Sequence, residues 1–275
     1  MLGAIAGDII GSVHERRKQK SKAFPLFVEG SAFTDDTVLS VAVAEGILAG
    51  QLSPDSDRET DYARTLKRYG QNYFSVGYGK NFKQWIVSDE LAPYNSWGNG
   101  SAMRVSPVGF AFDAAAEVLR VAAKSAEVTH NHPEGIKGAQ ATAIAVLMAR
   151  QGRSKSEIKA YLEQTFGYDL SRSLAEIQPD YRFHVSCQRS VPESIIAFLE
   201  STDFEDALRN AISLGGDADT MAAIAGGIAE AFYGGVPKAI AKEVLFRLDE
   251  PLRTTTLRFY QHYLPSQNYH ELIAT

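Results

Sequence analysis

The chain has 275 residues, of which 45% are hydrophobic and 22% charged, and its formal net charge is −5 at pH 7. These values are ordinary for a globular protein with a substantial core, and the length is compatible with one large domain over 1–275. The acidic balance, with only a short basic run at 16–20, argues against an extended nucleic-acid surface, because such a surface needs many phosphate contacts. A few basic side chains would still suffice to hold a small ligand that carries phosphate.

Cysteine content and the N-terminal segment bear on the cellular compartment. Cys187 is the only cysteine, so the chain can form neither an internal disulfide nor a thiolate metal site, and we expect a buried free thiol. The first residues lack a basic region, and Asp8 stands where a signal peptide would remain apolar. No apolar run reaches about 18 residues, the length that a membrane span requires. We therefore expect a cytoplasmic protein with no membrane association.

Helical periodicity begins at the N-terminus. The segment 2–14 is small and apolar, and Gly3, Gly7 and Gly11 recur every four residues, so one face of a helix there would carry no side chains. Glycine weakens an isolated helix, so this pattern predicts close backbone packing against a second helix. The segment 36–49 is apolar nearly all round and predicts a buried helix. The segment 60–74 has the pattern of an amphipathic helix.

A polar segment separates these helices from the rest of the chain. Residues 75–101 are rich in Gly, Asn and Ser and predict a loop, and a loop of this length is often functional. The segment 153–190 is also more polar and is expected to cover a site or to form a surface excursion. Strand-like alternation is scarce, with 181–185 as its best candidate, so the sequence predicts an all-α fold. Further helices are expected over 113–127, 134–151, 155–165, 191–200, 203–213, 218–233 and 237–247.

Four consecutive oxygen-bearing side chains, Thr34, Asp35, Asp36 and Thr37, stand at the entrance of the helix expected over 36–49. Taken alone, they are explained by helix capping, because Thr and Asp are favoured at helix N-termini. The alternative is a site for a hard cation, since carboxylate and hydroxyl oxygens are the ligands that Mg²⁺ and Mn²⁺ prefer.

A second cluster with the same composition opens the helix expected over 218–233. Asp217, Asp219 and Thr220 follow two glycines, although capping needs only one such residue. Carboxylates this close repel one another unless a cation or a proton intervenes, and buried ones must be paired or bind metal. Two such clusters together favour a hydrolase with two bridged ions that activate water and orient substrate. The lack of sulfur ligands and of a suitably spaced His pair argues against zinc.

Other candidate site residues carry weaker signals. Glu15 lies seven residues after Asp8, on the same face of a helix, and is either a salt-bridged surface residue or a carboxylate that swings over the metals. The glycines of 98–104 would let backbone N–H groups approach a phosphate, although a plain turn has the same composition. His130 and His132 precede a predicted helix, where they are either structural or in contact with a ligand.

The order of these motifs resembles that of the ADP-ribosylglycohydrolase family, which includes dinitrogenase reductase-activating glycohydrolase. The resemblance extends over about four fifths of the chain, and the Thr-Asp-Asp and Asp-x-Asp-Thr motifs are specific when they occur together. The matching segments are 3–8 with Gly11, Ser12 and Glu15, then 33–37, 94–104, 129–130 and 213–220.

The resemblance implies a compact, orthogonal helical bundle around a central dinuclear site with two Mg²⁺ or Mn²⁺ ions. It assigns Thr34, Asp35, Asp36, Asp217, Asp219 and Thr220 as metal ligands and Glu15 as a mobile glutamate near the ions. Asn99, Gly100, Ser101 and Met103 match the loop that holds the diphosphate and ribose, and His130 matches a residue near the phosphate or ribose.

The implied activity is hydrolysis of the bond between the anomeric carbon of ADP-ribose and an acceptor, either a protein side chain or another group. Such cleavage needs an activated water, and Glu15 or Asp35 is the expected proton-handling group. The family includes arginine-, serine- and nucleic-acid-linked specificities, and the basic residues after Glu15 do not identify the acceptor. Two alternatives stay open: a dinuclear phosphohydrolase that cuts P–O bonds in an ADP-ribose or nucleotide derivative, and a non-catalytic ADP-ribose-binding protein.

Overall fold

Helix α13 (Ala218–Phe232) lies at the centre of the molecule, and its residues from Ala218 to Glu230 are all buried. The computed structural model describes residues 1–267 and 269–272. The elements around α13 are α1 (Leu2–Gly11), α2 (Asp35–Leu48), α3 (Glu59–Asn72), α4 (Lys80–Val87), α5 (Gly100–Met103), α6 (Ser106–Ala111), α7 (Ala115–Glu127), α8 (Pro133–Arg150), α9 (Lys155–Phe166), α10 (Leu174–Ile177), α11 (Cys187–Leu199), α12 (Phe204–Ser213), α14 (Lys238–Arg247), α15 (Glu250–Tyr263) and the 3₁₀-helix η1 (Tyr269–Leu272).

The described residues form no β-strand, which confirms the predicted all-α fold. The strand candidate 181–185 is wrong: this segment is irregular, and the only β-type pairing within 1–267 and 269–272 is an isolated bridge between Gly98 and Ser186. That bridge is nevertheless informative, because it joins two segments that are far apart in the sequence and that both border the site described below.

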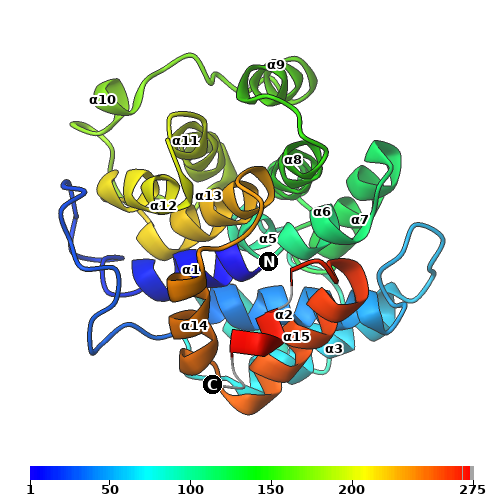
Figure 1. Ribbon diagram of the computed structural model, residues 1–275. Coiled ribbons are helices and arrows are strands. Elements are labelled where there is room, and N and C mark those ends of the chain that lie inside the picture. Colours follow the sequence, from blue (N-terminus) through cyan, green and yellow to red (C-terminus); the bar gives the residue numbers. More distant parts are fainter. Residues whose placement is uncertain (268, 273–275) are drawn as a thin grey trace.

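The glycine face of α1 packs directly against α13 (Figure 1), as its four-residue repeat predicts. A Cβ atom on Gly3 would lie 2.3 Å from the carbonyl oxygen of Gly226, and one on Gly7 would lie 2.1 Å from that of Ala222. At Gly11 the same atom would lie 2.5 Å from Cα of Asp219. Side chains would therefore force the two backbones apart. This close approach brings the end of α1 beside the first turn of α13.

Helix α2 is buried on nearly every side, as predicted, and packs against α1, α3, α6 and α15. Its N-terminus lies beside the middle of α1, because Asp8 accepts hydrogen bonds from the backbone N–H groups of Thr34, at 2.9 Å, and Thr37, at 3.0 Å. The N-termini of α2 and α13 are thus both placed against α1, and the two acidic motifs meet there.

Several element boundaries differ from expectation. Helix α1 ends at Gly11 rather than near residue 14, so Glu15 lies in a turn and not on a continuing helical face. The expected loop 75–101 contains α4, which forms because Phe82, Trp85 and Ile86 recur at helical spacing and become buried. The sequence analysis also missed α6, α10 and α15.

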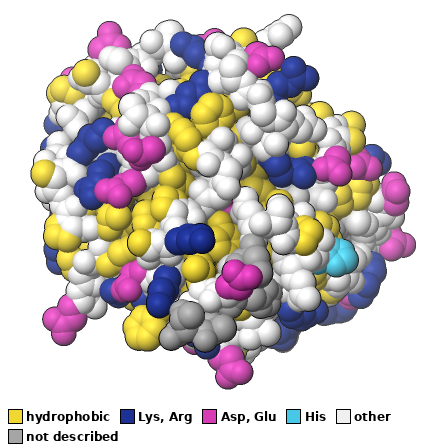
Figure 2. All heavy atoms as spheres, viewed as in Figure 1, with side chains coloured by type: hydrophobic (Ala, Val, Ile, Leu, Met, Phe, Trp, Pro, Cys, Tyr) yellow, Lys and Arg dark blue, Asp and Glu magenta, His cyan; other side chains and the backbone are white. Residues whose placement is uncertain are grey.

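The polar segments lie at the periphery. The loop that follows α1 projects from one side of the molecule (Figure 1). Helices α9 and α10 lie at the top of the molecule in the same view. On the face shown in Figure 2, basic and acidic side chains lie interspersed. Cys187 is a buried free thiol, as expected, and burial raises its pKa to about 12. Among the described helices, none combines the length and the apolar character needed to cross a bilayer.

Candidate metal and ligand site

Asp8 organises the first acidic motif. Its fully buried carboxylate accepts hydrogen bonds from the hydroxyl of Thr34, at 2.6 Å, and from that of Thr37, in addition to both backbone N–H groups. These bonds fix the entry of the chain into α2 and therefore the positions of Asp35 and Asp36. The Thr34 hydroxyl also caps α2 by accepting a hydrogen bond from the backbone N–H of Asp36 at 3.4 Å, and its remaining lone pair can bind a cation.

The two acidic motifs converge into one cluster at the N-termini of α2 and α13. Carboxylate oxygens of Asp8, Asp36 and Asp219 lie within 4.8 Å of one another, and so do those of Glu15, Asp217 and Asp219. Asp219 belongs to both groups and therefore joins them. The hydroxyl of Thr220 donates to Oδ2 of Asp36 at 3.4 Å, which ties the first turn of α13 to that of α2.

Burial and mutual repulsion make ionisation of the clustered carboxylates unfavourable and raise their pKa values. Burial, followed by the charges of neighbouring carboxylates, raises the pKa of Asp35 to about 8 and that of Asp36 well above its usual range. Burial raises the pKa of Asp217 to about 6, although the hydrogen bond from Asn99 opposes this shift. Burial and the charge of Asp217 raise the pKa of Asp219. Without a cation, Asp35 would hold its proton at neutral pH, whereas Asp217 would largely have lost its own.

The donor set fits a hard cation. Within residues 1–267 and 269–272, no Lys or Arg forms an ion pair with any of the five aspartates of the cluster, Asp8, Asp35, Asp36, Asp217 and Asp219. Oδ1 of Asp36 is buried and has no hydrogen-bond partner. Because a buried carboxylate oxygen without a partner is costly, this atom is well suited to bind a cation. The buried acidic cluster can hold a metal ion.

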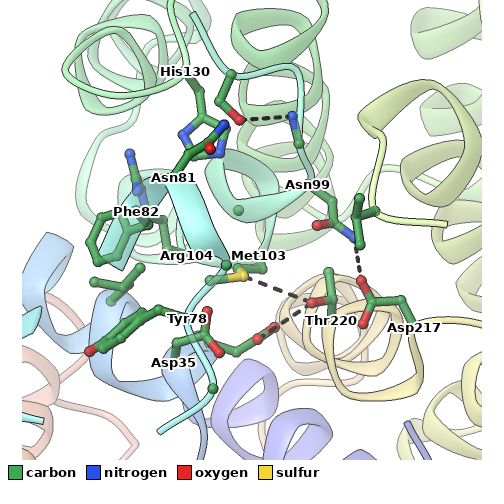
Figure 3. A pocket seen from close by; sticks show the side chains of 18 of the residues that line it. Asp35, Tyr78, Asn81, Phe82, Asn99, Met103, Arg104, His130, Asp217 and Thr220 are labelled. Atoms are coloured by element: carbon green, nitrogen blue, oxygen red, sulfur yellow. Dashed lines mark hydrogen bonds between the residues drawn. The ribbon is translucent and has the colours of Figure 1, made fainter. Parts of the chain in front are cut away.

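A cavity of about 550 Å³ opens beside the cluster. In Figure 3, Asp35, Thr220 and Asp217 lie on one side of it, while His130, Asn81 and Phe82 lie on the other. The far side is aromatic: Phe82 lies there, and ring centroids of Tyr94 and His130 are 6.1 Å apart. Tyr78, whose ring centroid is 4.9 Å from that of Phe82, extends this aromatic wall towards Asp35. The cavity thus joins an acidic end to an aromatic end, and its volume suits a ligand of dinucleotide size.

The turn at 98–101 connects these two ends. Nδ2 of Asn99 donates a hydrogen bond to Oδ2 of Asp217 at 2.8 Å. A Cβ on Gly100 would lie 3.0 Å from Nε2 of His130, so glycine there leaves the imidazole room beside the turn. Asn99, Gly100 and Met103 all line the cavity. The short helix α5 that begins in this turn packs against both α8 and α13.

His130 is held by a buried hydrogen-bonded chain. Its Nδ1 lies 2.8 Å from Oγ1 of Thr129, which in turn accepts a bond from Nη2 of Arg104 at 2.8 Å. Arg104 is fully buried and also donates to the carbonyl of Ser125. Burial and then the charge of Arg104 lower the pKa of His130 well below its usual value. His130 is therefore neutral, and Thr129 holds its Nδ1 side.

The structure brings most of the candidate residues from the sequence to this cavity. It is lined by Glu15, Asp35, Asp36, Asn99, Gly100, Met103, His130, Asp217, Asp219 and Thr220. Two other candidates do not line it. The hydroxyl of Thr34 is bonded to Asp8, and that of Ser101 donates to the carbonyl of Gly135 at 2.7 Å in a fully buried position.

Sequence reasoning did not place Asp8 in the acidic cluster and did not find the aromatic side of the cavity. A charged residue such as Asp8 within a small, apolar helix is a signal for a buried role. Tyr78 and Phe82 lie in the segment that was expected to be a loop. The helical spacing of Phe82 with Trp85 and Ile86 was the available signal for α4, whereas Tyr78 precedes that helix.

Comparisons with known proteins agree with this architecture. A model of the family described as ADP-ribosylglycohydrolase matches residues 1–267. A solved structure titled "ADP-ribosylglycohydrolase-related protein complex" superimposes with a TM-score of 0.70, covering 96% of this chain and 97% of the other, at 24% identity. At that identity, the structural match supports the fold alone.

Curated relatives align over most of their length. The protein named ADP-ribosylhydrolase ARH3 is 28% identical in Mus musculus, over 85% of this chain and 82% of that protein. Its Homo sapiens counterpart is 27% identical, over 85% and 84%. ADP-ribosylarginine hydrolase Tri1 of Pseudomonas putida is 25% identical, over 89% of this chain and 72% of that protein.

Proposed function

This chain belongs to the ADP-ribosylglycohydrolase family, and from that premise we propose that it hydrolyses the glycosidic bond between ADP-ribose and an acceptor with the help of two Mg²⁺ or Mn²⁺ ions. One observation carries the proposal: five buried or half-buried aspartates converge at the acidic end of a cavity, and no basic side chain within the described residues forms an ion pair with them. Metal-assisted hydrolysis of an ADP-ribose linkage needs such a site next to space for a diphosphate and a base.

Asp35, Asp36, Asp217, Asp219, Thr34 and Thr220 would hold the ions, as the family resemblance implies. When bound, two such ions would supply positive charge that neutralises the carboxylates, lowers the pKa of water and attracts the ribose hydroxyls. Asp8 serves as an orienting group, because its oxygens already accept four hydrogen bonds from Thr34 and Thr37. Asp8 takes the hydrogen of the Thr34 hydroxyl, which leaves the lone pair that does not accept from Asp36 available.

The ligand would lie along the cavity with its ribose at the acidic end. The backbone N–H groups of Gly100 and Ser101 and the side chain of His130 then lie beside the diphosphate, because those of Gly98 and Asn99 already donate to Ser96 and Val185. The aromatic side takes the adenine. Aromatic faces such as those of Phe82 and Tyr94 stack well on a nucleobase. This placement puts the scissile bond near Glu15, which lines the cavity at the acidic end.

Glu15 or Asp35 takes the proton from the attacking water. Glu15 lies in a turn after α1 and is half-buried, so its carboxylate is at the boundary between the cluster and solvent. Asp35 is the first residue of α2, and its backbone N–H donates a hydrogen bond to the carbonyl of Val76. Substitution can distinguish a residue that takes the proton from one that binds metal. If Glu15 or Asp35 takes the proton, Glu15→Gln or Asp35→Asn should lower kcat without weakening Mg²⁺ binding. If the residue is a metal ligand, the same substitution should weaken Mg²⁺ binding.

The test is a panel of ADP-ribosylated substrates with arginine, serine, acidic or nucleic-acid linkages, incubated with Mg²⁺ or Mn²⁺ and analysed for free ADP-ribose. We expect release from at least one linkage, and loss of that release with EDTA, Asp35→Ala or Asp219→Ala. Release that survives EDTA or both substitutions contradicts the proposal. Formation of AMP in place of ADP-ribose indicates cleavage of the pyrophosphate instead.

A further inference from the structure

A second cavity of about 680 Å³ adjoins the site on the side of Glu15. We call it the basic basin. It shares Glu15, Arg16 and Phe183 with the first cavity, so the two spaces are neighbours close to where the scissile bond would lie. Its lining residues are Glu15, Arg16, Lys18, Lys20, Tyr181, Arg182, Phe183 and Gly215.

Hydrogen bonds hold the walls of the basic basin together. The ammonium group of Lys20 donates to the carbonyls of Gln178, at 2.6 Å, Tyr181, at 3.0 Å, and Leu214, at 2.6 Å. The side chain of Gln178 donates back to the carbonyl of Lys20 at 3.0 Å. Gly215 has a φ of +68°, and a Cβ there would lie 2.9 Å from the carbonyl oxygen of Gln19. The segments 15–20 and 178–183 are therefore both anchored to the turn that precedes Asp217.

The charge of the basic basin is opposite to that of the chain as a whole, which carries a net −5. Four cationic side chains line it, namely those of Arg16, Lys18, Lys20 and Arg182. The opposing carboxylates are Glu15, whose Oε2 lies 3.9 Å from Nε of Arg16, and Asp180, which attracts Lys20. The positive excess contrasts with the interspersed charges on the face shown in Figure 2. A concave positive surface attracts anionic groups over several ångströms.

The basic basin also has an apolar component. Phe183 is 46% exposed, which is unusual for so large an apolar side chain, and Tyr181 contributes its ring to the wall. Just outside it, Val185 is also 46% exposed and lines the first cavity. Exposed apolar side chains surrounded by charged ones are typical of protein-binding surfaces.

We propose that the basic basin binds an acidic segment of the acceptor polypeptide, next to the ADP-ribosylated residue, with an apolar neighbour packed on Phe183. This inference rests on the proposed function and adds a substrate class to it. Carboxylates of the segment would meet Lys18 and Arg182, which line only the basin. A polypeptide fits better than a nucleic acid, since the cations are gathered in one partly apolar hollow rather than along a track that follows a phosphate backbone.

The experiment compares peptides that carry one ADP-ribosylated residue, in the linkage that the panel above identifies, and that differ only in flanking residues. One peptide has Asp and Leu beside the modified residue, a second has Ala, and a third has Lys. We expect kcat/KM for the Asp peptide to exceed that for the Lys peptide by roughly tenfold at low salt, because several weak charge pairs add up. The difference should shrink at about 0.5 M NaCl, where exposed charges are screened.

The variant Lys18→Glu/Arg182→Glu should reverse this order of preference, while Lys242→Glu, an exposed charge reversal on α14 outside both cavities, should preserve it. The rate of each variant on the Ala peptide checks that it is folded. Equal rates on all peptides, or a preference that the double variant leaves unchanged, overturn the basin assignment alone. Preference for an ADP-ribosylated oligonucleotide end, weakened by the double variant, assigns the basin to nucleic acid instead. Release from no substrate overturns the proposed function as well.

Discussion

Asn99 donates a hydrogen bond from Nδ2 to Oδ2 of Asp217 at 2.8 Å and thereby joins the turn at 98–101 to the acidic cluster. The two residues are separated by 118 positions in the chain, and both are buried. This bond is the main direct link between the part of the cavity that would hold the diphosphate and the part that would hold the ions. Loss of it should affect both.

We therefore expect Asn99→Ala to lower kcat/KM for ADP-ribose release by roughly 10- to 100-fold, the usual effect of removing a group that orients a metal ligand. The measurement is steady-state release of ADP-ribose over a range of Mg²⁺ concentrations. We expect the variant to need a higher Mg²⁺ concentration than the parent for half-maximal release. Asn72→Ala, at an exposed position at the end of α3, is the matched control. An Asn99 variant with the same Mg²⁺ requirement as the parent would contradict this role.

The raised pKa values of the cluster predict how stability depends on pH. In the metal-free protein, Asp217 and Asp35 keep their protons up to about pH 6 and about pH 8, whereas in the unfolded chain they lose them near pH 4. The folded state binds more protons between these values, so the stability of the metal-free protein should fall as pH rises from about 4 to 8.

Mg²⁺ should reverse that trend, because it binds the deprotonated carboxylates. We expect the increase in Tm on adding Mg²⁺ to be small at about pH 5 and to grow steadily towards about pH 8. Calorimetry of the protein in EDTA and in MgCl₂ across this range provides the measurement, with Asp35→Asn as a variant that should respond less. A Tm increase that is the same at both ends of the range is the contrary result.

Asp36→Asn should separate stability from activity. Oδ1 of Asp36 is buried without a partner, and burial together with the charges of Asp8, Asp35 and Asp217 raises the pKa of this group well above its usual value. At pH 8 the folded parent must therefore either keep a proton that the unfolded chain has released or bear an unfavourable charge, and a neutral Asn removes that cost. At pH 8 the metal-free variant should be more stable than the parent by about 1 kcal/mol or more, and yet it should lose Mg²⁺-dependent ADP-ribose release. Asp55→Asn, at a side chain that is 96% exposed, should change neither property. Destabilisation of the Asp36 variant in EDTA would argue against a cation site.

Gly7→Ala tests the contact that brings the acidic motifs together. The added Cβ would lie 2.1 Å from the carbonyl oxygen of Ala222, within the backbone of α13, and it cannot rotate away. We expect a loss of about 3 kcal/mol or more in the free energy of unfolding, measured by urea denaturation. Gly79→Ala is the control, because a Cβ there has no neighbour within 4 Å. Equal stability of the two variants would mean that α1 and α13 are not in direct backbone contact.

Thr129→Val tests the chain of hydrogen bonds from Arg104 to His130. The substitution keeps the size of the side chain but removes an acceptor from a buried guanidinium and the partner of Nδ1 of His130. We expect a loss of about 1–3 kcal/mol in stability and a higher KM, with Thr129→Ser restoring both. If the serine variant fails to recover KM, the hydroxyl does not act through His130.

The composition of the acidic site and the helical class can be predicted from the sequence alone. Periodicity identifies helices such as α2 and α13 because their apolar residues repeat locally, and Asp35, Asp36, Asp217 and Asp219 are visible as oxygen donors without any structure. The contact between α1 and α13 was predicted in part, since a glycine repeat on one helix face indicates that another backbone packs closely against it. The pattern could not say which helix does so.

The neighbours of those residues, in contrast, depend on how the helices pack in three dimensions. Asp8 joins the cluster because α1 packs on α13 at glycine distance, and its bonds to Thr34 and Thr37 span 26 and 29 positions. The aromatic side of the cavity and the basic basin likewise combine segments that are distant in the chain, such as 15–20 with 178–183. Local patterns determine whether a segment can form a helix, but burial, charge balance and the shape of a cavity depend on non-local contacts. For that reason the oxygen ligands of the site could be predicted from the sequence, whereas the cavities beside them are seen only in the folded structure.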